Sequence, residues 1–288
     1  MTEKEIYEAT PRSAVNRLKQ RGEDSTLSNT PNLVTFNCTL SAVYDHDTIH
    51  SIIDSAPVLH VSFNPTSYED DPFPTILPML GCTGSYTPPY ASETSPPAVY
   101  LHGHSASRFM KLSSDPLDDS LPGVPVCVAA THIDGLVLAL TPFNHSCNYR
   151  SAIIHGWAVL VTDPDEKTHA LTLITDSMVP SRWSHTRLPP TEAEMKSTGV
   201  IRIDIASASA KIRAYTAGDD AKDLEDTEMR RRVWAGVVPM NLVYGEPTPT
   251  PNNLVEEVPR YIEEWREREN EENMKYSREV AMRTAPKK

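Results

Sequence analysis

The sequence predicts a mainly β fold, a β-barrel with peripheral helices. Short runs of β-branched, aliphatic and aromatic residues recur between Val58 and Tyr244. Pro, Gly, Asp and Asn clusters separate these runs, and few segments show apolar residues at helical spacing. Many short strands joined by turns are typical of a barrel. The length of 288 residues is ample for a buried core.

Composition narrows the class of protein. The formal net charge of -12 argues against non-specific binding to nucleic acid and to anionic membrane surfaces. No run of about 18 apolar residues predicts a membrane-spanning helix, and the first ten residues lack the apolar stretch of a signal peptide. The four cysteines are widely spaced, so we expect reduced thiols and no metal site. A cytoplasmic protein without a nucleic-acid or membrane partner is the expectation.

The chain divides into a polar, partly mobile segment 1–43, a barrel domain 44–259 and a charged C-terminal helix 260–288. A helix reaching about Ser55 follows Asp45 or Asp47 as the N-cap, because Ile49, Ile52 and Ile53 have helical spacing. We expect strands at Val58–Asn64, Thr75–Gly81, Val99–His102, Val124–Ile133, Leu136–Leu140, Ala152–Thr162, Thr198–Ala206 and Trp234–Tyr244, with a weaker candidate at Leu33–Val43. Further helices are expected at Ser105–Leu112, Pro164–Met178, Thr191–Lys196 and Val258–Glu272.

Three local patterns support these assignments. Asp134-Gly135 is a two-residue turn signal, which predicts a hairpin between the strands on either side of it. Thr191 and Glu194 have the spacing of a capping box. The C-terminal helix carries Tyr261, Ile262 and Trp265 at helical spacing, and we expect its far end to be frayed.

A first candidate site follows Tyr100-Leu-His-Gly. Ser105, Ser107 and Arg108 stand where a strand passes into a helix, and free backbone N–H groups with hydroxyls and a guanidinium suit a phosphate. The alternative is an ordinary serine N-cap beside a solvated arginine.

A second candidate site is the polar block Asn144–Ser151, which lies between Phe143 and an apolar strand. Asn148, Arg150 and Ser151 could hydrogen-bond a polar heterocycle, and His145 could serve as an acid, a base or a metal ligand. The alternative is a wide connection whose polar groups satisfy their own backbone. Lys211 and Arg213, two residues apart on a strand, either meet an anion or pair with this chain's own carboxylates.

Taken together, these pieces resemble the pyridoxamine 5'-phosphate oxidase-like, FMN-binding split-barrel family. The branch of flavin-nucleotide-binding proteins and nitroimidazole reductases is the most similar, in its fungal form. The segments that carry the resemblance are Thr48–Ile53, Pro57–Phe63, Pro74–Met79, Tyr100–Gly103, Ser107-Arg108, Val126–Val128, Asp134–Leu138, Phe143–Ser151, Glu166-Lys167, Val179–Trp183, Ala210–Arg213 and Trp234–Pro239.

The resemblance implies a homodimer with FMN at the interface. Ser105, Ser107 and Arg108 would then hold the phosphate, and Ile76, Leu77 and Pro78 would run along the isoalloxazine ring. The block Asn148, Tyr149, Arg150 and Ser151 would reach the ring or the phosphate, and Lys211 is a further candidate contact. His102 takes the place of an active-site histidine in the nitroimidazole reductases.

Three functions remain open at this point. The first is an FMN-dependent oxidoreductase acting on a small organic molecule, with His102 or His145 delivering a proton. The second is a non-catalytic flavin-binding protein. The third is a split barrel that holds haem, with His145 or His102 as the axial ligand.

Overall fold

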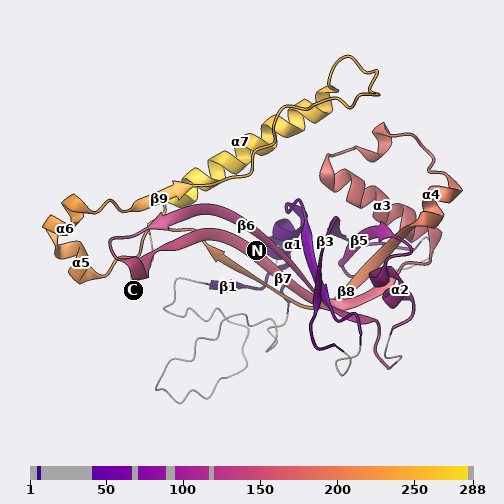
Figure 1. Ribbon diagram of the computed structural model, residues 1–288, viewed down its shortest axis with the longest axis horizontal. Helices are drawn as coiled ribbons and strands as arrows, with labels where there is room; N and C mark the ends of the chain where they lie inside the picture. The colour runs from indigo at the N-terminus through magenta and orange to yellow at the C-terminus, as the bar shows by residue number, and fades with distance from the viewer. Residues whose placement is uncertain (1–4, 8–40, 67–70, 89–94, 117–119, 285–288) are drawn as a thin grey trace.

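The computed structural model describes residues 5–7, 41–66, 71–88, 95–116 and 120–284 (Figure 1). The strands are β1 Ser41–Val43, β2 Leu59–Phe63, β3 Thr75–Met79, β4 Gly81–Gly84, β5 Ala98–His104, β6 Val124–Leu138, β7 Ser146–Leu160, β8 Thr198–Arg213 and β9 Gly236–Pro239. The α-helices are α1 His46–Asp54, α2 Arg108–Ser114, α3 Pro164–Met178, α4 Glu192–Ser197, α5 Ala221–Glu225, α6 Thr227–Arg232 and α7 Arg260–Met282. Two short 3-10 turns are η1 Pro142–Asn144 and η2 Trp183–His185. Among the described residues, no helix is long and apolar enough to cross a membrane.

One antiparallel sheet forms the barrel. Its strand order is β3-β2-β6-β7-β8-β5-β4, with β1 added beside β8 and β9 beside β6. The two end strands, β3 and β4, are consecutive in the chain and are separated only by Leu80. The chain therefore passes directly from one edge of the sheet to the other, which brings the two edges together. The expected mainly β barrel with peripheral helices is confirmed.

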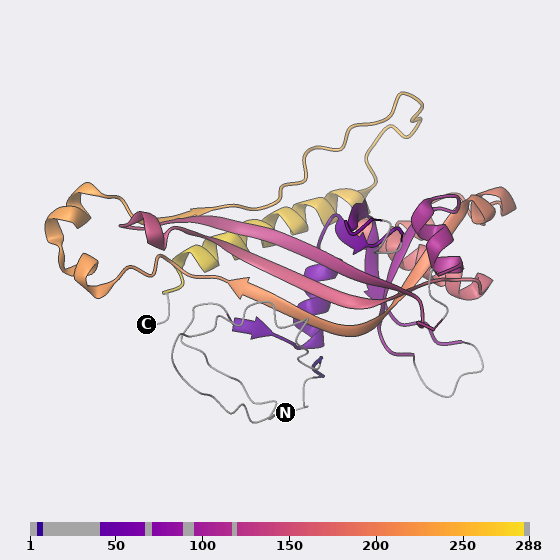
Figure 2. The ribbon, with the colours of Figure 1, turned by 60° about the horizontal axis from the view of Figure 1, so that its bottom comes forward.

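A long arm projects from the barrel (Figures 1 and 2). Strands β6, β7 and β8 have 15, 15 and 16 residues, whereas β2 to β5 have only 4 to 7, so the far halves of the long strands continue past the barrel. Strand β9 pairs with the far half of β6, and α7 lies along the arm. At 1.5 Å per residue the 23 residues of α7 span roughly 34 Å.

Helix α1 closes the barrel interior. Asp45 caps it by accepting a hydrogen bond from the Thr48 amide at 3.0 Å, as the sequence predicts. Ile49, Ile52 and Ile53 are at most 3% exposed and join the core cluster that β2, β5, β6, β7 and β8 line. Burying three isoleucines stabilises the fold by about 1.5–3 kcal/mol each relative to exposure.

Helix α7 ties the barrel to the arm at both of its ends. At the barrel, Tyr261 stacks on His185 with ring centroids 4.2 Å apart and accepts a hydrogen bond from Arg182. At the arm, Val280 is fully buried and the carbonyl oxygen of Arg283 accepts from the Thr216 amide at 2.9 Å. The expectation of a frayed C-terminal end is therefore wrong for the described residues, because the last turns dock on the arm.

The predicted hairpin at Asp134-Gly135 is also wrong. Strand β6 runs through this dipeptide with an irregularity between Ile133 and Gly135. Asp134 is buried and accepts hydrogen bonds from Arg150 of the next strand. Asp134 and Gly135 therefore form a bulge within β6 and not a turn.

The strands of the arm differ in length from those that the sequence predicts. Strand β7 begins at Ser146, so most of the polar block lies inside a strand and is not a connection before it. Strand β8 continues past Ala206 to Arg213 because it pairs with both β7 and β1. Strand β9 covers only Gly236–Pro239 of the expected Trp234–Tyr244. The strand expected from Leu33 lies outside the described residues, except for β1 at its end.

Candidate functional site

The end of β3 and the turn between β5 and α2 lie together. A Cβ on Gly103 would stand 3.7 Å from the methyl carbon of Met79, so the last residue of β3 touches the end of β5. Ile76 is 62% exposed and Pro78 is exposed, whereas Leu77 packs against the core. The structure thus brings two of the predicted groups, Ile76–Pro78 and the Ser105–Arg108 turn, to the same end of the barrel.

Within this turn the hydroxyl of Ser107 already has a structural role. It caps α2 by accepting from the Met110 amide at 3.4 Å, which matches the ordinary N-cap alternative. Ser105 and Arg108 are exposed, and no described residue hydrogen-bonds or pairs with the Arg108 side chain. Among the described residues, the Arg108 guanidinium is therefore available to meet an anion, and the Ser107 hydroxyl, which only accepts in the cap, still has its O–H to donate.

His102 lies one residue before Gly103 on β5. Its side chain is half-buried, and burial lowers its pKa below the ordinary value. The Nδ1 atom is buried and has no hydrogen-bond partner in the described part of the chain. An imidazole without a partner, held neutral by its surroundings, can accept or donate a proton to a molecule that enters beside it.

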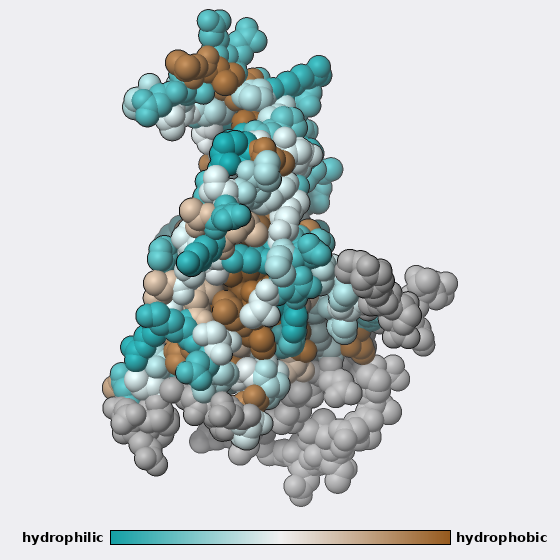
Figure 3. Space-filling model, turned by 90° about the vertical axis from the view of Figure 1, so that its right-hand side faces the viewer, coloured by the Kyte–Doolittle hydropathy of each residue, from teal (hydrophilic) through white to brown (hydrophobic). Residues whose placement is uncertain are grey.

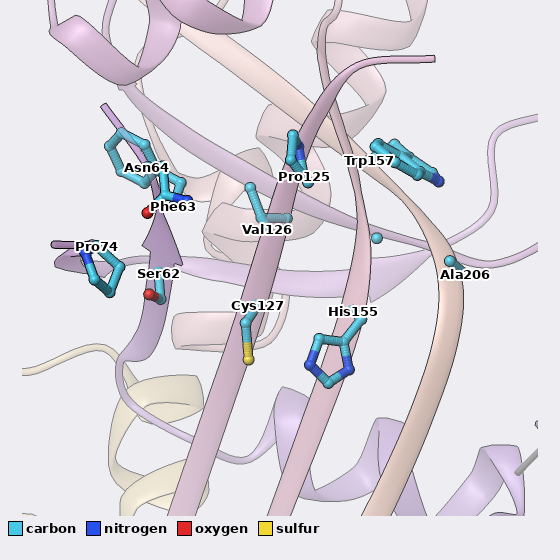
Figure 4. Close-up of a pocket in the computed structure, with 11 residues that line it drawn as sticks. Ser62, Phe63, Asn64, Pro74, Pro125, Val126, Cys127, His155, Trp157 and Ala206 are labelled. Atoms are coloured by element: carbon cyan, nitrogen blue, oxygen red, sulfur yellow. The ribbon is translucent and has the colours of Figure 1, made fainter. Parts of the chain in front are cut away.

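A cavity opens on the outer face of the same sheet (Figure 4). It has a volume of about 230 Å³. Ser62 of β2 is opposite Cys127 of β6, and Cys127 is opposite His155 of β7, so the three side chains form a row across neighbouring strands. Its other lining residues are Phe63, Asn64, Pro74, Pro125, Val126, Gly156, Trp157 and Ala206. The cavity combines apolar walls with a few polar groups, as small-molecule sites do.

A β-bulge shapes this cavity. The pairing of β7 with β8 shifts between His155 and Gly156, which leaves Ala206 as the extra, exposed residue. A Cβ at Gly156 would lie 2.4 Å from the carbonyl oxygen of Asp204, so only glycine fits there. Bulges beside a cavity re-aim the neighbouring side chains, here His155 and Trp157.

Neither His155 nor Cys127 is among the sequence-predicted site residues. Cys127 lies in Val126–Val128, a segment that contributes to the family resemblance without an assigned role, and His155 lies in an apolar strand; only the strand register places the two side by side. Burial raises the pKa of the Cys127 thiol, so this group is a neutral thiol and not a nucleophilic thiolate. The described residues contain no group of three or more His, Cys, Asp and Glu side chains arranged to hold a metal ion.

The polar block lies on the arm, along β7 from the cavity residue His155, and part of it stabilises the fold. Asn148 is fully buried, and its side-chain oxygen accepts hydrogen bonds from Arg213 and from the Tyr215 amide. Arg150 donates to both carboxylate oxygens of Asp134, at 2.8 and 3.1 Å, and its guanidinium lies 4.2 Å from the ring centroid of Tyr276 on α7.

The alternate side chains of the block remain half-exposed. The Tyr149 ring lies 5.9 Å from the Lys211 ammonium, and Ser151 donates to the Lys211 carbonyl oxygen at 3.2 Å. His145 lies outside the strand, at the tip of the arm, where its exposed ring bonds the Thr141 carbonyl oxygen at 2.9 Å. The predicted site residues therefore fall into two groups, one at the barrel and one on the arm.

Comparisons with known proteins agree with this architecture. The family model described as pyridoxamine 5'-phosphate oxidase matches residues 45–212. The structure of the flavocytochrome Anf3 from Azotobacter vinelandii is 29% identical, with a TM-score of 0.62 over 78% of this chain and 92% of that one. An FAD and heme binding protein from Mycobacterium smegmatis is 22% identical, with a TM-score of 0.62 over 78% of this chain and 97% of that one. Among curated proteins no match is found.

Proposed function

This chain belongs to the pyridoxamine 5'-phosphate oxidase family, and from that premise we propose that it binds FMN and acts as an oxidoreductase on a small organic molecule. The resemblance seen in the sequence is confirmed at the level of the family. The similarity to a flavocytochrome supports a flavin cofactor. The observation that carries the proposal is the contact between β3 and the β5–α2 turn. It brings Ile76–Pro78, the residues expected along the flavin ring, close to Ser105–Arg108, the residues expected at its phosphate.

The side chains at this meeting point have separable roles. The exposed edge of β3 would offer backbone groups to the rim of a planar ring, and Arg108, which pairs with no described residue, would neutralise a phosphate. A bound flavin would supply the hydride or electron transfer. His102 would hold or release a proton next to the ring, and the cavity beside His155 and Trp157 would receive a small organic molecule and exclude water from it.

A second copy of the chain is part of the proposal. The outer face that carries the cavity continues along the arm and exposes apolar side chains in several rows. Ile76 is 62% exposed, Ile133 and Leu136 are 42% exposed and Val238 is 44% exposed. Four strands at about 4.8 Å spacing over about ten residues at 3.4 Å give a face of roughly 650 Å². That is close to the roughly 800 Å² per partner of a standard interface, so two copies packed by this face would form a stable homodimer.

The first experiment is an absorption spectrum of the purified protein, followed by denaturation and identification of the released nucleotide. Flavin absorption with FMN in the supernatant supports the proposal. FAD in the supernatant would instead identify the cofactor as the dinucleotide. A colourless protein that also fails to take up added FMN and FAD refutes it. Stoichiometric flavin without turnover of any electron acceptor would instead favour the non-catalytic flavin-binding alternative.

A matched pair of variants tests the phosphate contact. Arg108→Ala removes the guanidinium at the start of α2, and Lys111→Ala removes an exposed cation one turn later in the same helix. Arg108→Ala should weaken FMN retention about tenfold, since one charge-assisted bond is worth about 1.5–3 kcal/mol and this one is partly screened. Lys111→Ala should leave retention unchanged. Equal retention in the two variants would remove Arg108 from the site.

Haem is a second candidate cofactor, favoured by the similarity to a flavocytochrome over 78% of this chain. The donor chemistry also fits, because the exposed imidazole of His145 has one ring nitrogen bonded to a carbonyl oxygen and the other available. A Soret band in the spectrum of the purified or hemin-treated protein would establish it, alone or beside the flavin.

A further inference from the structure

We propose that the cavity shown in Figure 4 binds an uncharged molecule with a single flat ring and one short hydrogen-bonding substituent. The inference rests on the proposed function, because it names the class of substrate for the site beside the flavin. Ser62 of β2 is opposite Cys127 of β6 on one side and Ile76 of β3 on the other. The cavity therefore begins directly beside β3, the strand expected along the flavin ring.

The size of the cavity limits its occupant to one ring. Its volume is about 230 Å³. A cavity of roughly 150 Å³ in another protein holds one benzene molecule. The difference leaves room for one short substituent, but not for a fused system of three rings. A flavin would therefore lie beside the cavity, along β3, and leave the cavity to a smaller molecule.

Side chains line the cavity in two parallel rows, because residues two apart on a strand share a face. Pro125 of β6 is opposite Trp157 of β7, and these two side chains form an apolar row. Cys127 and His155, each two residues further along its strand, form the next row. At 3.4 Å per residue the rows are about 6.8 Å apart. A flat ring that packs on the indole of Trp157 thus places a short substituent over the second row.

The second row offers hydrogen-bonding groups at three neighbouring positions. Ser62 continues this row on β2, so a hydroxyl, a thiol and an imidazole lie side by side across three strands. At about 4.8 Å between strands the row is roughly 10 Å long. The hydroxyl and the imidazole can each donate or accept a hydrogen bond, whereas the thiol is a weak partner. The row therefore suits a substituent such as an amide, a carbonyl or a hydroxyl group.

The walls of the cavity offer no counter-ion to a charged ligand. The described residues that line it include no lysine, arginine, aspartate or glutamate. Burial raises the pKa of the Cys127 thiol, so this group is neutral at pH 7. Asp204, opposite Trp157 on β8, accepts a hydrogen bond from Arg202 at 2.7 Å, so its charge is already compensated. An ion entering the cavity would lose hydration without gaining a partner, and for that reason the ligand is uncharged.

Titration of the full-length protein with probes of similar size, followed by NMR of the ligand, tests the class. Benzamide is flat and neutral. Benzoate and benzylamine keep the ring but are charged at pH 7, and cyclohexanecarboxamide keeps the amide on a puckered ring. Benzamide should bind, and each of the other three should bind at least about tenfold more weakly. Absence of benzamide binding overturns the proposal, and so does equal binding of benzoate, benzylamine or cyclohexanecarboxamide.

Matched variants test the two rows separately. Trp157→Leu should weaken the binding of benzamide and of toluene about tenfold, whereas Trp234→Leu, on the arm and outside the cavity, should change neither. His155→Leu and Ser62→Ala should each weaken benzamide about fivefold but spare toluene, which has no polar substituent. His60→Leu is the control, because His60 is exposed on the same face outside the cavity. Equal losses of benzamide and toluene in both polar-row variants overturn the role of that row.

Addition of FMN distinguishes this inference from the proposed function. Saturating FMN should leave the affinity for benzamide unchanged, because the two molecules are expected to occupy adjacent places. If FMN displaces benzamide, the cavity holds the flavin ring, and the inference fails while the flavin proposal stands. If the protein takes up no flavin but discriminates the probes as stated, the proposed function fails and the ligand class of the cavity is supported. Circular dichroism of each variant separates loss of ligand from loss of fold.

Discussion

Removing Asp134 should destabilise the arm more than any exposed carboxylate of the protein. Asp134 is 5% exposed in its side chain and holds the Arg150 guanidinium with two hydrogen bonds, and Arg150 also lies over the Tyr276 ring. This arrangement joins β6, β7 and α7 at one point. Asp134→Ala therefore leaves the Arg150 guanidinium largely buried and without the carboxylate that neutralises it.

The magnitude follows from burial. Removing one partner of a fully buried ion pair costs about 3–5 kcal/mol, because the remaining charge is left without compensation. Arg150 keeps 21% of its side chain exposed, so water can solvate part of the guanidinium, and we expect about 3 kcal/mol. At roughly 2–4 °C per kcal/mol for a chain of this size, the melting temperature should fall by roughly 6–12 °C.

Urea and thermal unfolding followed by circular dichroism measure this loss. Glu264→Ala is the matched control, because its pair with Arg260 is 56% and 89% exposed on α7 and should contribute only about 0.3–0.5 kcal/mol. A double variant with Arg150→Met should recover much of the loss, since it removes the stranded charge. If Asp134→Ala costs no more than Glu264→Ala, the buried bridge does not hold the arm and the reasoning is refuted.

Three further outcomes are expected. Gly156→Ala should lower the unfolding free energy by about 2 kcal/mol or more and distort the cavity, because its Cβ would lie 2.4 Å from a backbone oxygen; thermal unfolding checks this. Burial lowers the pKa of His50, partly offset by Asp54, so the neutral ring is favoured in the fold and its stabilisation is present above pH 6.5 and lost as pH falls. Urea unfolding of His50→Gln should accordingly show a flatter pH dependence below 6.5 than the wild type. Tyr100→Phe removes a 3.0 Å bond to the buried Glu166 and should cost about 1 kcal/mol at pH 7, whereas an unchanged midpoint would show that Arg202 alone satisfies this carboxylate.

Local signals in the sequence predicted the elements whose caps and periodicity lie within one segment. Asp45 caps α1, Thr191 and Glu194 form both bonds of the capping box of α4, and Pro164–Met178 is the helix expected. In each case the group that decides the structure lies within a few residues of the structure it decides. The family could also be predicted from the sequence, because its motifs occur in order along the chain.

The arm could not be predicted in the same way. Its part of β8 reads Ser-Ala-Ser-Ala-Lys, residues of modest strand preference, and it is a strand because β7 and β1 pair with it on both sides. The cavity was missed for the same reason. Cys127 and His155 are 28 positions apart, and the register that places them opposite each other is set by the whole β6–β7 pairing.

The loop before α7 exposes apolar side chains that its composition does not predict. Residues 245–258 contain three prolines and three glutamates. In the structure this loop projects from the body, and hydrophobic surface is visible at its end, where Leu254 is 94% and Val255 59% exposed (Figure 3). Exposure of this kind depends on what the rest of the fold leaves uncovered, which no single segment specifies.

The polar block of β7 explains why the motif with the strongest resemblance was the hardest to assign. Side chains alternate across a strand, so one block serves two faces. Asn148 and Arg150 are committed to Arg213 and Asp134, and substituting them would disturb the fold before any ligand. Tyr149 and Ser151 are half-exposed and lie beside Lys211. A contact from this block to flavin or to a second copy must therefore come from Tyr149, Ser151 and Lys211, and substitutions there should change ligand retention or association without the stability loss expected at Arg150.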